Sequence, residues 1–492
     1  MTVKVQGKAR RRLAAALGIC LAAALAVAPG NAPASAAGTG PCDIYASGGT
    51  PCVAAHSTVR ALYGSYGGNL YQVRRSSDNT TRDIAVLAAG GTANATTQDT
   101  FCAGTSCVIT VVYDQSGRGN DLWYQGSSVV PGSSQSRPAT ATSEALTVGG
   151  GKAYSLYINP GNSYWRDGHL TGVPTGSAPE GMYMVTSGTH VNGGCCFDYG
   201  NSETTRSADA AGAMDAINFS TQCWFGGCSG TGPWVQADLE WGLFSGGSQS
   251  WNPNQRAFPN RFVTAMLKNN GTSRFAIKGA NAQSGGVTTL WDGSLPPGYS
   301  PMRKQGAIIL GSGGDCCKPG GGANLSAGTF YEGAMVSGYP SDATENAVQA
   351  NIIAAGYSSG GSGATGAVRS VAAGRCLDVN AGSTAAGTPL QIWDCNGGTN
   401  QTWTRTASGQ LTVYSGDSTR CAAASGTQTG AAAVIAACDG GAGQRWQFNA
   451  NGTVSSAQSG LCLDVNGAAT ANGTKTILWT CHGGGNQQWT TG

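Results

Sequence analysis

A three-fold repeat in the last quarter of the chain restricts the possible folds more than any other feature. "RCLDVN" at 375–380 recurs as "LCLDVN" at 461–466, and "RCAAAS" at 420–425 lies between them. The three units end in "CNGGTNQTW", "CDGGAGQRW" and "CHGGGNQQW", which places Trp403, Trp446 and Trp489 at equal intervals. Strand-forming units of this length are too small to fold alone, so they must share one hydrophobic core.

The repeats resemble the ricin-type β-trefoil of carbohydrate-binding module family 13, because each has a cysteine pair and a Gln-x-Trp motif. The resemblance implies one disulfide within each repeat: Cys376–Cys395, Cys421–Cys438 and Cys462–Cys481. It also implies that a carboxylate, an aromatic residue and a polar cluster in one repeat bind sugar.

Two repeats have the residues that such sugar sites need. The first supplies Asp378, Trp393, Asn396, Asn400 and Gln401, and the third supplies Asp464, Trp479, His482, Asn486 and Gln487. The second repeat has Ala423 and Ala436 in place of the aspartate and the aromatic residue, so we expect it to be structural. A trefoil that serves only as a spacer is the alternative, but a spacer has no need of exposed tryptophans beside aspartates.

The first 37 residues have the pattern of a secretory signal peptide, with a cationic start, a short apolar run and a small-residue cleavage motif. The run is short for a membrane anchor, and the paired arginines leave twin-arginine export open. Removing this segment takes five basic residues away from a formal charge of +3, so the mature chain has no basic excess that would favour nucleic acid. We therefore expect a secreted, extracellular monomer with no membrane or nucleic-acid partner.

Cysteines are abundant after the signal segment, where 16 of the 17 remain. An even number in an oxidising compartment favours disulfides, and a chain with only four histidines has few ligands for zinc. Two adjacent pairs, Cys195–Cys196 and Cys316–Cys317, are unusual. Such pairs can ligate a metal, bridge to other parts of the chain or close on each other, and the residues alone leave these alternatives open.

The region before the repeats consists of short strand-like runs separated by glycine-rich turns. In "WVQADLEWGLF", alternation places Glu240 on the same face as Asp238, and Leu239 and Trp241 on the opposite face. Asp315 follows a strand-like run at "LGSGGD", where side chains often serve function. Neighbouring carboxylates suit acid–base work, because one of them tends to stay protonated. A solvated strand face and an ordinary turn are the alternatives.

Long motifs in this region resemble the catalytic domain of glycoside hydrolase family 54, the secreted α-L-arabinofuranosidases. They include "VVYDQSGRGNDL", "GGCCFDYGN", "ADLEWGLFSGG" and "GTFYEGAMVSGYPSDATENAVQANIIAAGY", and the resemblance runs from Gly40 to Tyr357. It implies a β-sandwich and a retaining double displacement, with Glu240 as nucleophile and Asp315 as acid/base. Such a site needs its two carboxyl groups roughly 5–5.5 Å apart. Glu332 in "FYEG" is the rival acid.

The resemblance also implies the sugar contacts and further disulfides. The implied contacts are Asp238, the backbone of Gly314, Trp224 and a vicinal disulfide, Cys195–Cys196, which would form a rigid plate against the apolar face of the sugar. The remaining bridges implied by the family are Cys42–Cys52 and Cys102–Cys107.

The sequence departs from the family pattern at several positions. Trp241 stands where asparagine is usual, which puts one polar contact to the substrate in doubt. Cys223 and Cys228 bracket a loop of the expected pocket wall, and a disulfide between them would stiffen it. We predict that Cys316–Cys317 closes as a second vicinal disulfide, with cross-bridging to the first pair as the alternative. The tail is ricin-type, whereas the fungal members have an arabinose-binding trefoil of a different family.

We therefore predict an all-β protein, a catalytic β-sandwich followed by a β-trefoil. The predicted parts are a signal peptide at 1–37, a catalytic domain at 38–356, a Gly/Ser linker at 357–367 and a sugar-binding trefoil at 368–492. The predicted activity is removal of terminal arabinofuranosyl side chains from arabinoxylan or arabinan, without cofactor or metal. The trefoil would anchor the enzyme to plant cell-wall polysaccharide such as xylan. A glycosidase of shifted specificity and a non-catalytic sugar-binding protein are the alternatives.

Overall fold

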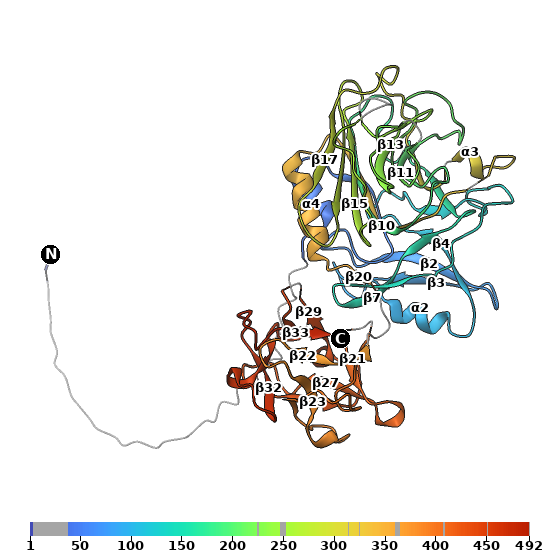
Figure 1. The fold of residues 1–492 in the computed structure, drawn as a ribbon. Helices are drawn as coiled ribbons and strands as arrows, with labels where there is room; N and C mark the ends of the chain where they lie inside the picture. Colours follow the sequence, from blue (N-terminus) through green and yellow to red (C-terminus); the bar gives the residue numbers. More distant parts are fainter. Residues whose placement is uncertain are drawn as a thin grey trace. The chain divides into compact units, whose positions relative to one another are not determined.

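The protein is almost entirely built of β-strands (Figure 1). The computed structural model describes residues 1–2, 38–223, 226–246, 252–312, 314–323, 325–359, 365–406, 409–449 and 451–491. The all-β prediction is confirmed, whereas the predicted signal peptide lies outside the described residues apart from its first two positions. Within the described ranges, the helices are all too short or too polar to span a membrane.

Two antiparallel sheets form a sandwich in the first part of the chain. The first sheet has the strand order β1-β19-β10-β15-β16-β17, and β8 pairs with β19 at its side. Its strands are β1 Cys52–Ser57, β8 Leu156–Ile158, β10 Glu180–Val191, β15 Val263–Asn269, β16 Phe275–Asn281, β17 Thr288–Gly293 and β19 Gly328–Ser337.

The second sheet has the strand order β14-β13-β12-β11-β18-β9-β5-β4-β2-β3. Its strands are β2 Asn69–Arg75, β3 Thr81–Ala85, β4 Cys107–Val112, β5 Leu122–Tyr124, β9 Ser163–Asp167, β11 Asp198–Ser202, β12 Asp215–Ser220, β13 Trp234–Asp238, β14 Leu243–Phe244 and β18 Ala307–Gly311. Strands far apart in the sequence are neighbours here, so residues that no local pattern connects come together.

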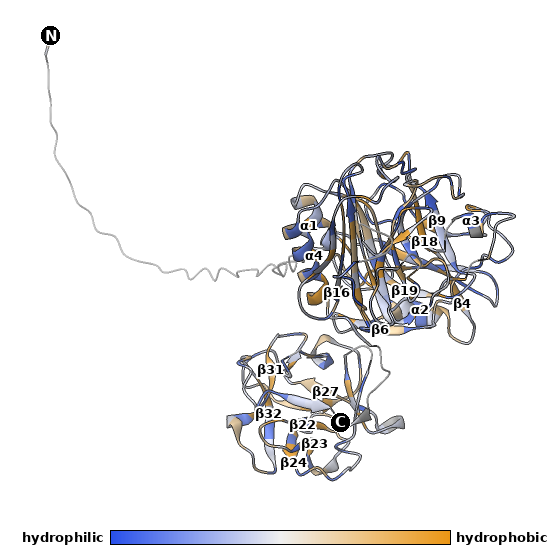
Figure 2. Cartoon of the chain, turned by 45° about the horizontal axis from the view of Figure 1, so that its top comes forward, coloured by the Kyte–Doolittle hydropathy of each residue, from blue (hydrophilic) through white to orange (hydrophobic). Residues whose placement is uncertain are grey.

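The inner faces of the two sheets share one core. Tyr199 on β11 packs against Phe330 on β19 with ring centroids 5.0 Å apart, and its hydroxyl lies 3.0 Å from Nδ1 of His56 on β1. Figure 2 shows apolar residues on the strands of the sandwich, while α4 (Asp342–Ala354) carries both polar and apolar residues. Burial of these apolar side chains provides the main driving force for folding.

Helices close the sandwich on the outside. Helix α4 covers the face of the first sheet that is turned away from the second (Figure 1). Nζ atoms of Lys268 and Lys278, on β15 and β16, donate to Oε2 of Glu345 on α4 at 2.8 and 2.5 Å. Such buried charges are tolerated because they are paired. The other helices are α1 Pro41–Ser47, α2 Ala95–Phe101 and the single turn α3 Gly314–Cys317, and disulfides Cys42–Cys52 and Cys102–Cys107 fasten the first two.

Residues 365–491 form the three repeats around a core of their own. One sheet has the order β21-β25-β26-β27-β28 and another the order β29-β30-β31-β32-β24-β23-β22-β33. The strands are β21 Thr365–Gly366, β22 Val368–Ser370, β23 Cys376–Val379, β24 Leu390–Trp393, β25 Trp403–Arg405, β26 Leu411–Val413, β27 Arg420–Ala424, β28 Ala433–Ala436, β29 Trp446–Phe448, β30 Val454–Ser456, β31 Cys462–Val465, β32 Thr474–Trp479 and β33 Trp489–Thr491.

The three repeated tryptophans have the same role in each repeat. Trp403, Trp446 and Trp489 are buried, and their Nε1 atoms donate to the backbone oxygens of Leu377, Ala422 and Leu463 at 2.8, 2.9 and 3.0 Å. A disulfide lies within each repeat: Cys376–Cys395, Cys421–Cys438 and Cys462–Cys481. The indoles therefore join the shared core in all three repeats, as the sequence spacing requires.

The predicted linker at 357–367 begins and ends inside folded structure. Strand β20 (Ser358–Ser359) pairs with β6 (Ala145–Val148), which pairs with β7 (Gly151–Tyr154). At the other end, β21 pairs with β25 of the trefoil. Residues 360–364 lie outside the described residues. Strand β20, just after the predicted boundary at 356, thus belongs to a small sheet with β6 and β7.

Candidate active site

A pocket of about 210 Å³ lies where the neighbouring strands β11, β12 and β13 meet the segment that follows β18. Pairing of Asp198 with Asn218 on β12 and with Gly311 on β18 brings these segments together. The pocket is lined mainly by carboxyl groups and by one disulfide: Cys195, Cys196, Asp198, Glu203, Ala208, Met214, Asp238, Glu240, Asp315 and Ala323. Glu240 and Asp315, predicted as the catalytic pair, therefore line the same small space.

Glu240 is presented by a turn and not by a strand face, which corrects the alternation predicted from the sequence. Strand β13 ends at Asp238, and both Glu240 and Trp241 have positive φ angles of 62° and 59°. The Glu240 N–H donates to Oδ1 of Asp238 at 3.1 Å, and the Leu239 N–H donates to the oxygen of Gly242 at 3.1 Å. Left-handed backbone is uncommon for residues other than glycine and clusters at functional sites.

Trp241, predicted with doubt as a substrate contact, points into solvent. Its side chain is 62% exposed, and its Nε1 lies 3.3 Å from the backbone oxygen of Ala208, which lines the pocket. The indole is not part of the described pocket wall, so it stands at the rim.

The vicinal cysteines form one side of the pocket. Cys195 and Cys196 are bonded to each other, so neither is bridged to the second pair in this structure. The loop before them is fixed by Asn192, whose Oδ1 accepts hydrogen bonds from the backbone N–H groups of Gly194 and Ala327 at 3.1 and 2.9 Å. The disulfide is consequently held as a rigid apolar surface against the carboxyl groups.

Burial raises the pKa of three of the pocket carboxyl groups and so favours their protonated form. Burial, followed by the charges of Glu240 and Asp315, raises the pKa of Asp238 to about 8. Burial and the charge of Asp238 hold the pKa of Asp198 well above its usual value, although the Asn218 amide donates to its Oδ1 at 2.8 Å. Burial and then the neighbouring Glu240 carboxyl group raise the pKa of Glu203 to about 10. Near neutral pH these groups can donate hydrogen bonds to sugar hydroxyls.

Asp315 enters from the other side of the site. It lies in α3, which begins at Gly314 just after β18, and its side chain is exposed at the pocket. The predicted vicinal disulfide with Cys316 lies outside the described side chains. Trp224, predicted to line the pocket, also lies outside the described residues, but the flanking Cys223 and Cys228 form a disulfide.

Glu332, the rival acid, lies in the core of the sandwich and does not line the described pocket. Its two carboxylate oxygens accept from Nε and Nη2 of Arg60 at 2.5 and 2.7 Å. The hydroxyl groups of Tyr183 and Tyr357 donate to the same carboxylate at 3.1 and 2.6 Å. With every oxygen paired and no exposed surface, this glutamate is a structural residue.

Asp198 and Glu203 are site residues that sequence reasoning missed. Both follow the vicinal cysteines closely, within "CCFDYGNSE", and this proximity was the available signal. Donor atoms of Cys196, Asp198 and Asp238 lie within 4.8 Å of one another, as metal ligands would. Since the Cys196 sulfur is bonded to Cys195, it offers no thiolate, and the set reduces to two protonated carboxyl groups.

The first repeat of the trefoil contains a second pocket, of about 330 Å³. Asp378 lies at its base and accepts hydrogen bonds from the side-chain amides of Gln391, Asn400 and Gln401 at 2.9, 2.7 and 2.9 Å. Trp393 stands beside it with its ring 41% exposed. Asn396 also lines this pocket, and its N–H donates to Oε1 of Gln401 at 2.9 Å.

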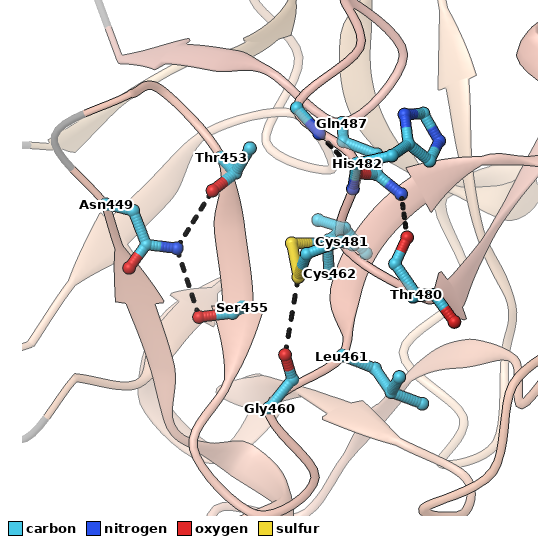
Figure 3. Close-up of a disulfide and its surroundings, with 12 residues drawn as sticks. Asn449, Thr453, Ser455, Gly460, Leu461, Cys462, Thr480, Cys481, His482 and Gln487 are labelled. Carbon is cyan, nitrogen blue, oxygen red and sulfur yellow. Dashed lines mark hydrogen bonds between the residues drawn. A yellow bond between two sulfur atoms is a disulfide. The ribbon is translucent and has the colours of Figure 1, made fainter.

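The third repeat arranges its predicted residues in the same way. Side-chain amides of Asn486 and Gln487 both donate to Oδ2 of Asp464 at 2.9 Å, and the His482 N–H donates to Oε1 of Gln487 at 2.8 Å. Figure 3 shows Gln487 and His482 next to the disulfide Cys462–Cys481. Trp479 is exposed like Trp393. Among the described residues of the second repeat, only Gln444 has an equivalent role, since its Oε1 accepts from the Asp439 N–H.

A pair of Asp or Glu carboxyl groups facing one pocket is the arrangement that glycoside hydrolases use. The family model for the catalytic domain of α-L-arabinofuranosidase B matches residues 41–358, and that for the ricin-type β-trefoil lectin domain matches residues 364–489. This chain belongs to the α-L-arabinofuranosidase B family, glycoside hydrolase family 54.

Individual relatives agree with this assignment. The chain is 54% identical over 323 residues to a probable α-L-arabinofuranosidase B of Aspergillus terreus, across 65% of this chain and 62% of that protein. It is 52% identical to an arabinofuranosidase/β-xylosidase of Trichoderma koningii, across 65% and 63%. The chain thus matches less than two thirds of the length of these relatives. A solved arabinofuranosidase complexed with arabinofuranosyl-α-1,2-xylobiose has a TM-score of 0.61 and 37% identity, over 92% of this chain and 98% of that one.

Proposed function

We propose that this chain is a retaining α-L-arabinofuranosidase that removes terminal arabinofuranosyl residues from plant cell-wall polysaccharide. The observation that carries the proposal is the convergence of Glu240 and Asp315 on one pocket beside the Cys195–Cys196 disulfide. The pocket volume of about 210 Å³ is below the range of roughly 300–1,000 Å³ that drug-sized ligands occupy. It suits a single sugar unit, and therefore cleavage from the end of a side chain.

The proposed reaction has two steps. Glu240 attacks the anomeric carbon while Asp315 protonates the glycosidic oxygen, so the aglycone leaves and an arabinosyl ester forms on Glu240. Asp315 then removes a proton from water, which attacks the same carbon and releases arabinose with its configuration retained. Protonated Asp198 and Asp238 are available as donors to the sugar hydroxyls, and the disulfide provides an apolar surface for the ring.

Arabinoxylan is the preferred candidate substrate, since a structural relative was solved with an arabinosylated xylobiose. The alternative is a shifted specificity, because Trp241 replaces a polar contact and one relative is named as a β-xylosidase as well. The seven disulfides of the described residues support secretion, and the trefoil sites support work outside the cell on a bound polymer.

A panel of aryl glycosides tests the proposed activity. We expect kcat/KM for the α-L-arabinofuranoside to exceed that for the β-xyloside and the β-galactoside by at least about tenfold, as expected when a pocket recognises one sugar ring. Faster release from another glycoside would establish a shifted specificity. Absence of release from all three, by a folded protein, would favour the non-catalytic sugar-binding alternative.

The trefoil is proposed to hold the enzyme on xylan through its first and third repeats. In the full chain, Asp378→Ala combined with Asp464→Ala should weaken retention on insoluble xylan by at least about tenfold, because two linked weak sites act through effective concentration. Turnover of the aryl arabinofuranoside should not change. Asp439→Ala in the second repeat is the matched control.

Trp393→Ala with Trp479→Ala provides a second version of the test, because both rings are exposed and their loss leaves the core intact. Xylan retention equal to wild type in both double variants would show that these sites do not hold the polymer.

A further inference from the structure

Glu203 lines the active-site pocket but has no role in the reaction described above. It follows the last residue of β11, and it is only 4% exposed. The turn that carries it is fixed, because the Arg206 N–H donates to the Glu203 backbone oxygen at 3.3 Å and the Thr204 N–H donates to Oε1 of Gln305 at 2.9 Å. A buried carboxyl group on a rigid turn is therefore directed into the site.

The Glu203 and Glu240 carboxyl groups line the same pocket of about 210 Å³, and Oε1 of Glu203 is buried there without a hydrogen-bond partner among the described residues. Two carboxyl groups in one small pocket repel each other when both are ionised, so one of them keeps its proton and can donate to the other. Burial disfavours the charged form, and Glu203 is buried whereas Glu240 is partly exposed. The proton consequently resides on Glu203, which leaves Glu240 as the acceptor.

No cationic side chain lines this pocket among the described residues. The nearest cations in sequence are engaged elsewhere: the Arg206 guanidinium donates to the backbone oxygen of Pro131, and Lys318 donates to Ser207. The other carboxyl groups of the wall are those of Asp198, Asp238 and Asp315. A neutral Glu203 is thus the described neighbour best placed to orient Glu240 without adding charge.

We propose that protonated Glu203 is a positioning residue, which donates its O–H to one carboxylate oxygen of Glu240 and leaves the other oxygen to attack the sugar. The proposal rests on the nucleophilic role of Glu240 given above. Burial and the neighbouring Glu240 carboxyl group raise the pKa of Glu203 to about 10, so the donor is present throughout the neutral range.

This donor has a different effect on the two steps. When Glu240 becomes an arabinosyl ester, its carboxyl group loses the negative charge and the hydrogen bond weakens. When water displaces the ester, the Glu240 carboxylate is the leaving group and the hydrogen bond regains strength. Loss of the donor should therefore slow hydrolysis of the covalent intermediate more than its formation.

Two variants test whether Glu203 acts as a hydrogen-bond donor and not through its size or its charge. Glu203→Gln keeps a neutral donor of nearly the same shape, and kcat should stay within about threefold of wild type. Glu203→Met removes the donor, and kcat should fall at least about tenfold, as for the loss of a hydrogen bond to a charged group. KM should fall together with kcat, since the intermediate accumulates. Mass spectrometry of protein quenched during turnover should then show a pentosyl adduct on Glu203→Met.

The kinetics of these variants distinguish a donor role of Glu203 from a structural or anionic role. Equal impairment of both variants, or a loss of kcat in Glu203→Met without a fall in KM, would overturn the proposal in favour of a structural or anionic role. Glu203→Ala serves the same comparison if the methionine variant does not fold, as judged by its melting temperature. Normal turnover by Glu240→Gln would overturn the underlying assignment, whereas an inactive Glu240→Gln with a normal Glu203→Met would contradict only the role of Glu203.

Discussion

Glu240→Gln is expected to lower kcat on an activated aryl arabinofuranoside by at least about 10³-fold, which corresponds to roughly 4 kcal/mol of transition-state stabilisation. An amide is a poor nucleophile, and no other described glutamate reaches the pocket except the protonated Glu203. Glu240→Gln should remain folded, because Glu240 is partly exposed and its backbone N–H makes the bond to Asp238. Steady-state kinetics and the melting temperature check both statements.

Asp315→Ala should slow a different step of the reaction from the one that Glu240→Gln slows. An activated phenolate leaves without protonation, so the first step is largely preserved, while the second lacks its base. We expect a burst of aryl release followed by slow turnover. Asp83→Asn, an exposed residue on β3 distant in the sheet order, is the control with wild-type kinetics. Near-wild-type turnover by Glu240→Gln would show that the nucleophile is another residue.

Glu332→Ala is expected to lower the free energy of unfolding of the sandwich by about 3–5 kcal/mol, since it leaves the Arg60 guanidinium buried without its partner. The hydroxyl groups of Tyr183 and Tyr357 lose their acceptor at the same time. Activity per folded molecule at low temperature should be unaffected, which separates Glu332 from the acid role that the sequence left open.

Thermal unfolding followed together with residual activity measures this effect. Asp292→Ala is the matched control: it breaks the Arg274–Asp292 pair, in which the arginine is exposed, and such pairs contribute little. If Glu332→Ala kept its stability but lost activity, the assignment of Asp315 as the acid would have to be abandoned.

The sequence predicted the fold class and several residues of the pocket wall, among them Asp238, Glu240 and Asp315, but not how they are presented. The alternation in "WVQADLEWGLF" holds as far as Asp238 and then fails, because Oδ1 of Asp238 accepts the Glu240 N–H in a turn where the strand ends. Such a local side-chain bond competes with the strand ladder and leaves no trace in a hydrophobic pattern.

Asp198 and Glu203 could not be found from spacing alone. They reach Asp238 and Glu240 through the pairing of β11, β12 and β13, which joins segments far apart in the chain. Conversely, "FYEG" at Glu332 looks equivalent to a catalytic strand end in the sequence, yet its strand lies in the other sheet of the sandwich. The order in which the strands pair therefore decides that Glu332 forms a buried ion pair and does not act as the acid at the site.

In the trefoil, the residues that stabilise the fold are different from those proposed to bind sugar. Three indoles donate to three backbone carbonyls in the same manner, whether or not the repeat has an aspartate and an exposed tryptophan. The second repeat, with Ala423 and Ala436, shows that the proposed ligand positions can be vacated while its indole and its disulfide stay in place. The number of sugar-binding sites on such a module can therefore change between one, two and three during evolution, because the residues that form them are not needed for folding.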